Sequence, residues 1–180
     1  MAFSRHEPIT AKSTTGAVRQ AAKYYTYRTG SDLEAGGRTW ATGDGRTGLS
    51  LDDVRHELRE HATTSRQAYI FVLSTKQAAL GVDDYRATLD GHYDHYYLIE
   101  HHNTDHPHCH GIGFRDKQFK KAELRTIYDE LGARERSVER ARDRQPERRA
   151  ERDVPDQTDR QPSAEQQTHR AADQERGLER

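Results

Sequence analysis

The chain has few of the residues that a large hydrophobic core or an extracellular protein needs. Hydrophobic residues make up 32% of its 180 residues, charged residues make up 33%, and the mean hydropathy is -1.17. Such a composition is too polar for one core that includes the whole chain. A single cysteine, Cys109, excludes an intramolecular disulfide and is typical of a reducing compartment, so we expect a cytoplasmic protein.

Long apolar runs and an excess of one charge are also missing. No stretch of about 18 apolar residues exists, which predicts no membrane-spanning helix, and the start "MAFSRHEPIT" lacks the apolar segment of a signal peptide. Lys and Arg number 29 against 30 Asp and Glu. Since nucleic-acid-binding proteins usually carry a basic excess, this balance counts modestly against such a partner.

Large apolar residues become rare towards the C-terminus. No aromatic residue follows Tyr128, and aliphatic residues are sparse after Leu131. We therefore predict a folded domain over residues 1–131 and a low-complexity tail, rich in Arg, Glu and Gln, over residues 132–180. Alternating Arg and acidic residues allow the start of this tail to form an exposed helix, and the prolines further on favour disorder.

The domain alternates between helical and strand patterns. Helices are predicted over 13–30, 51–62, 81–91 and 121–132, and strands around Trp40 and over 68–75, 95–102 and 108–114. Ser50 is expected to cap the second helix, with Asp53 as its capping-box partner. A short turn joins the last two strands, so we expect an α+β domain with an antiparallel sheet of about five strands and flanking helices.

Histidine is the residue that the chain has in surplus, because seven of its eleven histidines lie between His92 and His110. Residues at alternate positions of a strand share a face, so His108 and His110 point the same way and Cys109 points the other way. Across a hairpin, His101 can lie opposite His108, where Cβ atoms are about 5 Å apart. Three imidazoles converging on one point, with positions left open, predict a catalytic metal site.

The stretch "HHNTDHPHCHGIGF" resembles the third motif of relaxases, the HUH-type single-strand DNA endonucleases of plasmid conjugation and mobilisation. In the resemblance, His101, His108 and His110 match the metal-binding histidines. Asn103 stands where the family usually has Asp, and our hypothesis is that Asp105 takes over part of that orienting role. His106 is either a phosphate contact or a plain turn residue.

The resemblance extends to an early tyrosine motif, here "YTYR" from Tyr25 to Arg28. In the family this tyrosine is the nucleophile. Tyr25 also lies on the helical stripe of Val18, Ala21 and Ala22, so it is the first candidate, with Tyr24 next and Tyr27 behind. Arg28 is expected to contact phosphate or to form an exposed ion pair.

The resemblance implies site- and strand-specific nicking of single-stranded DNA at a transfer origin, through a covalent 5′-phosphotyrosine. Possible partners are accessory mobilisation proteins. The cofactor is a divalent ion, Mn²⁺ or Mg²⁺, and neutral imidazoles suit Mn²⁺ better. Tyr93, Tyr96 and Tyr97 are candidates for base stacking, although the sequence favours ordinary strand aromatics at these positions.

Three alternatives stay open at this point. A rolling-circle replication initiator or single-strand transposase of the same class would place its tyrosine after the histidine pair, where Tyr128 is available. A non-catalytic metal- or DNA-binding derivative would keep the fold without the reaction. A metal-dependent hydrolase of small substrates would keep the three histidines and need no tyrosine.

Overall fold

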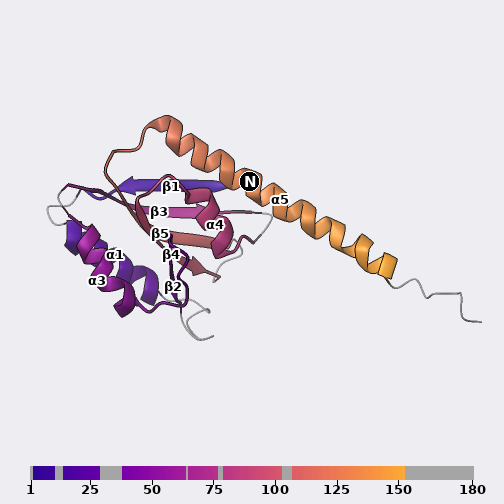
Figure 1. Cartoon of the computed structure of the whole chain (residues 1–180), viewed down its shortest axis with the longest axis horizontal. Coiled ribbons are helices and arrows are strands. Elements are labelled where there is room, and N and C mark those ends of the chain that lie inside the picture. The colour runs from indigo at the N-terminus through magenta and orange to yellow at the C-terminus, as the bar shows by residue number, and fades with distance from the viewer. Residues whose placement is uncertain are drawn as a thin grey trace, which may run out of the picture. The chain divides into compact units, whose positions relative to one another are not determined.

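The computed structural model of the chain describes residues 2–10, 14–28, 38–63, 65–76, 79–102 and 107–152, with side chains up to residue 144. Five strands form one sheet in the order β1-β3-β5-β4-β2, and every neighbouring pair is antiparallel (Figure 1). The strands are β1 (Phe3–Pro8), β2 (Trp40–Thr42), β3 (Gln67–Ser74), β4 (His95–His101) and β5 (His108–Arg115). The helices are α1 (Thr14–Tyr27), α3 (Leu51–His61), α4 (Val82–Leu89) and α5 (Lys121–Arg152). The predicted α+β class is confirmed.

Strand β1 is the element that the sequence did not predict. Among the described strands it lies at the edge of the sheet and pairs with β3, from Phe3 opposite Ser74 to Pro8 opposite Tyr69. An edge strand buries little of its surface, so the residues of "FSRHEP" are mostly polar and show no apolar alternation. The edge position also tolerates Pro8, which has no backbone N–H to donate.

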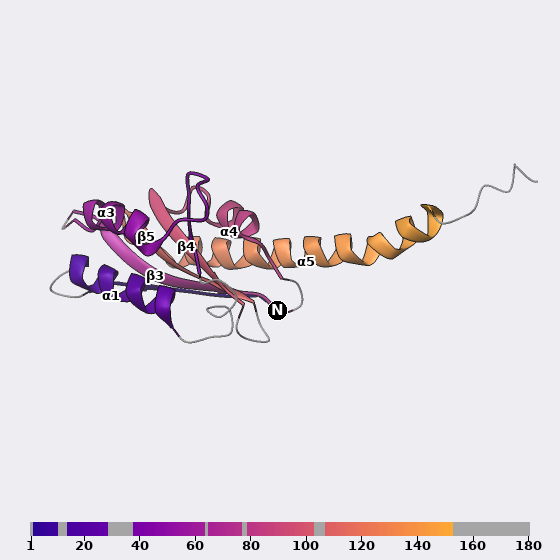
Figure 2. The same ribbon diagram turned by 90° about the horizontal axis from the view of Figure 1, so that it is seen from below.

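The two faces of the sheet carry two separate cores. On one face, Val18, Ala22 and Tyr25 of α1 and Val54 and Leu58 of α3 cover the strands. On the other, Tyr85 and Leu89 of α4 and Ile127 and Leu131 of α5 do so. Figure 2 shows α1 and α4 on opposite sides of the strands. We call these the α1 face and the α5 face.

Glycine in β5 makes room for aromatic rings on the α5 face. A Cβ at Gly111 would collide with the ring of Phe71, and a Cβ at Gly113 would collide with the ring of Tyr93. The motif "HCHGIGF" therefore has two functions. Its histidines point to the α1 face, and its glycines let aromatic side chains lie flat against the backbone on the α5 face.

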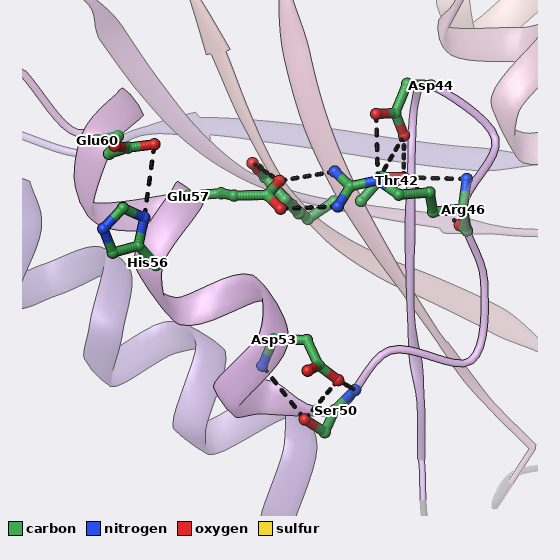
Figure 3. A network of polar contacts seen from close by, with 9 residues as sticks. Thr42, Asp44, Arg46, Ser50, Asp53, His56, Glu57 and Glu60 are labelled. Atoms are coloured by element: carbon green, nitrogen blue, oxygen red, sulfur yellow. Dashed lines mark hydrogen bonds and ion pairs between the residues drawn. The ribbon is translucent and has the colours of Figure 1, made fainter.

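A polar network attaches α3 to the β2 turn (Figure 3). Ser50 and Asp53 form the predicted capping box at the start of α3. Both terminal nitrogens of Arg46 donate to Glu57, at 2.7 Å each, and the hydroxyl of Tyr97 donates to the same carboxylate at 3.0 Å. These contacts fix α3 against the strands that carry the histidines.

Helix α5 continues past the predicted end of the domain. Glu135 is buried and accepts a hydrogen bond from the backbone N–H of Lys76 at 2.7 Å, and Val138 packs against the core. Grouping by Cα proximity gives one unit over Met1–Asp143 and another over Arg144–Arg180. The predicted boundary at residue 131 thus falls inside a helix, because Leu131, Glu135 and Val138 continue its packed stripe at helical spacing.

Residues 153–180 of the predicted tail lie outside the described residues. Among the described residues, no helix is both long enough and apolar enough to cross a membrane.

Candidate metal centre

The pairing of β4 with β5 brings the three predicted histidines together. His101 lies directly opposite His108, and Ile99 lies opposite His110, so His110 is diagonal to His101. One nitrogen from each ring can be chosen so that all three lie within 4.8 Å of one another. In the part of the chain that the structure describes, this is the one such group of potential metal ligands.

The three rings surround a common point. Their centroids are 4.6 Å apart for His101 and His110, 5.0 Å for His108 and His110, and 5.2 Å for His101 and His108. The planes are inclined to one another by 58° to 78°, so the rings converge and do not form a stack. Convergent imidazoles match the donor set of Mn²⁺, Fe²⁺ or Zn²⁺ sites.

His110 shows most directly that the cluster fits a metal ion. Both of its ring nitrogens are buried and have no hydrogen-bond partner among the described residues. Burial, and then the neighbouring His101 and His108, lower the pKa of His110 to about 3. The ring is therefore neutral at physiological pH, and a bound cation would use a buried lone pair that otherwise costs stability.

Contact with α1 orients His101. This side chain is fully buried, and its Nε2 lies 3.1 Å from the backbone oxygen of Tyr25. A carbonyl oxygen only accepts, so Nε2 must carry the proton, and in the neutral ring Nδ1 then has the lone pair that a metal needs. The same contact joins the candidate metal centre to Tyr25, the candidate nucleophile.

Tyr25 lies directly against the histidines. Its ring stacks on that of His110, with centroids 4.4 Å apart and planes inclined by 21°. Burial is the main cause that raises the pKa of Tyr25 to about 12. At neutral pH the phenol is therefore protonated, and it becomes a competent nucleophile only where nearby positive charge favours the phenolate.

The other two tyrosines of α1 do not share this position. Tyr25 is 7% exposed, whereas Tyr24 is 54% and Tyr27 is 61% exposed. The guanidinium carbon of Arg28 lies 5.7 Å from the ring centroid of Tyr24, on the exposed side of the helix. Helical geometry thus separates Tyr25, which faces the histidines, from the two tyrosines that face solvent.

Arg38 is a residue of the site that sequence reasoning missed. It is 7% exposed, and its Nη1 donates to the backbone oxygens of Tyr25, at 3.1 Å, and Arg28, at 2.6 Å. It thereby holds the last turn of α1, where a cation is favoured by the helix dipole. The glycine-rich sequence before it gave no periodic signal, so only the fold reveals this role.

A groove opens beside the histidines along the sheet edge. It has a volume of about 210 Å³ and is lined by Tyr25 and His110 at one side. The remaining lining comes chiefly from Phe3, Arg5 and Glu7 of β1 and Ile70 and Val72 of β3. A ligand that occupies this groove along edge strand β1 would therefore contact Tyr25.

Other sequence expectations have mixed outcomes. Asn103, Asp105 and His106 lie outside the described residues. Tyr93, Tyr96 and Tyr97 are strand aromatics, as the favoured interpretation had it, and not stacking residues, because they are 7%, 8% and 2% exposed and belong to the two cores. They lie next to the histidines in sequence, but strand packing buries them.

Comparison of the chain with models of protein families, with curated proteins and with solved structures finds no match to any of them.

Proposed function

We propose that the chain is a metal-dependent enzyme that nicks single-stranded DNA and transfers the strand through Tyr25, in the manner of a relaxase. The observation that supports this best is the stacking of Tyr25 on His110, within a cluster of three convergent histidines. A metal site without a nucleophile would suit many hydrolases. A buried tyrosine against the metal ligands, beside an open groove, favours covalent catalysis.

The residues have distinct parts in this reaction. His101, His108 and His110 would hold the cation. When bound, a divalent ion supplies positive charge that offsets charge developing on the scissile phosphate. His101 and Arg38 both contact the backbone oxygen of Tyr25, so they position the nucleophile. Neutral imidazole ligands favour Mn²⁺ over Mg²⁺.

The covalent step balances without a further reactant. The Tyr25 oxygen forms a bond to phosphorus and loses its proton, while the bond from phosphorus to the 3′ oxygen breaks and that oxygen takes up a proton. The products are a 5′-phosphotyrosine and a free 3′-hydroxyl. One phosphodiester is exchanged for another, so a 3′-hydroxyl can later reverse the step and rejoin the strand.

The test is an adduct assay with labelled single-stranded DNA carrying the transfer origin of a mobilisable plasmid, in the presence of Mn²⁺. Wild-type protein is expected to give a protein–DNA adduct that survives denaturation, and chelation of the metal is expected to abolish it. Tyr25→Phe should give no adduct, while Tyr24→Phe, Tyr27→Phe and Tyr128→Phe should keep it. An adduct that persists in Tyr25→Phe and disappears in Tyr128→Phe would instead indicate the chain order of a replication initiator.

A further inference from the structure

The solvent-facing side of α1 has an unusual composition. Its exposed residues recur at helical spacing, from Arg19 and Gln20 through Lys23 and Tyr24 to Tyr27, and Arg28 follows the helix. No acidic residue occurs anywhere in 14–28, although the whole chain has a net charge of -1. An ordinary exposed helix face mixes acids with bases.

Exposed aromatic rings are the second unusual feature. Among the described residues, the large hydrophobic side chains that are exposed are Phe3, Tyr24 and Tyr27. All three flank the candidate nucleophile, because Phe3 lines the groove beside Tyr25 and the two tyrosines are its neighbours on α1. The ring centroid of Tyr24 is 5.9 Å from that of Tyr25.

The exposed tyrosine rings and the cationic side chains of this helix face line the same surface depression. A shallow depression of about 600 Å³ is lined by Gln20, Lys23, Tyr24, Tyr27 and Arg28. Proteins that hold single strands combine cations along the backbone with aromatic rings on which bases stack. Tyrosines at i and i+3 lie on neighbouring turns of one helix face, so they present two rings side by side.

We propose that this face of α1, which we call the tyrosine platform, binds single-stranded DNA next to the cleavage site. Tyr24 and Tyr27 stack on bases, and Lys23 and Arg28 contact phosphates. The proposal rests on the proposed function for its choice of ligand, and it assigns the two tyrosines that do not face the histidines a role in holding the strand. Tyr25, between them, is left for the reaction.

The experiment measures DNA binding without catalysis. A fluorescent oligothymidylate is titrated with the full chain in a chelating buffer, so that neither metal nor cleavage contributes. Tyr24→Ala and Tyr27→Ala should each weaken binding by roughly 5- to 100-fold, the range expected for loss of one stacked base. Alanine favours helix at these exposed positions, so both variants are expected to fold, which circular dichroism checks.

Two controls separate stacking and phosphate contact from other effects. Tyr24→Phe and Tyr27→Phe keep the ring and should bind as wild type does. Lys23→Ala with Arg28→Ala should reduce the dependence of log affinity on log salt by about 0.7 for each lost phosphate contact. Arg59→Ala with Arg140→Ala removes two exposed cations elsewhere and should leave that slope unchanged.

The outcomes distinguish this proposal from the proposed function. Binding that is equally tight to duplex DNA, or unaffected by the alanine variants, would overturn the tyrosine platform even if wild-type protein forms the Tyr25 adduct. Aromatic-dependent binding with no adduct under any metal condition would support the platform and reject the strand-transfer reaction.

Discussion

Two histidine–tyrosine pairs, each with a buried tyrosine and a half-buried histidine, lie on opposite faces of the same sheet. On the α5 face, Nδ1 of His6 lies 2.7 Å from the hydroxyl of Tyr93, and rings of Phe71 and Phe119 pack around the pair. On the α1 face, His110 stacks on Tyr25, and no described residue forms a hydrogen bond to either ring nitrogen of His110.

The comparison shows that burial and a shifted pKa do not by themselves define a functional site. Burial lowers the pKa of both histidines, to about 4 for His6 and about 3 for His110. What differs is the surroundings. Aromatic side chains enclose His6, whereas two further imidazoles converge on His110 and a groove leads to it. Convergent ligands with access for a substrate distinguish the α1 face.

The largest expected difference between the two pairs is in catalysis. Tyr25→Phe should reduce adduct formation by roughly three orders of magnitude or more, because it removes the proposed nucleophile. Tyr93→Phe should leave adduct formation near wild type and cost about 1 kcal/mol of unfolding free energy, through its lost hydrogen bond to His6. Parallel adduct assays and urea denaturation measure both. Equal loss of adduct in Tyr25→Phe and Tyr93→Phe would contradict a catalytic difference between the two histidine–tyrosine pairs.

His6 should contribute to the dependence of stability on pH, beside His110, whose pKa is lowered in the same direction. The pKa of His6 is about 4 in the folded protein and near 6.5 when unfolded, so the unfolded state binds more protons between these values. Stability is therefore lost as pH falls from 6.5 towards 4, by up to about 3 kcal/mol from this residue. His6→Gln keeps a polar partner for Tyr93 and cannot titrate. We expect the urea midpoint of His6→Gln to fall less than that of wild type between pH 6.5 and pH 4. The same fall in both proteins would contradict the lowered pKa of His6.

Glycine in β5 should matter for packing on the α5 face. Gly111→Ala places a Cβ into the ring of Phe71 and should cost about 1–3 kcal/mol of unfolding free energy. Gly81→Ala is the control, because open space surrounds that position, and about 0.5 kcal/mol is expected since glycine is a better helix N-cap than alanine. Thermal unfolding compares them. Equal stability of the two variants would mean that Phe71 can move aside from the added Cβ at little cost in free energy.

The sequence predicted the elements whose periodicity is strong and missed those without it. The alternation in "HCHGIGF", together with the turn before it, was enough to place His101 opposite His108. Strand β1 was not predicted because an edge strand needs few apolar residues. The role of Arg38 was not predicted because long-range contacts with α1 decide its position. For the tyrosines beside the histidines, the sequence left base stacking open beside the favoured interpretation as strand aromatics, and only the strand registers show that they are buried.

Titration with Mn²⁺ tests the difference between the two faces most directly. Calorimetry on wild-type protein should show one bound ion per chain. His110→Ala should weaken binding by more than the roughly 10- to 100-fold that loss of an outer hydrogen-bond partner costs, because a direct ligand is removed. His6→Gln, which alters the half-buried histidine of the α5 face, should bind as wild type does. Failure of wild-type protein to bind Mn²⁺ or another divalent transition metal, or binding that His110→Ala leaves intact, would contradict the metal centre.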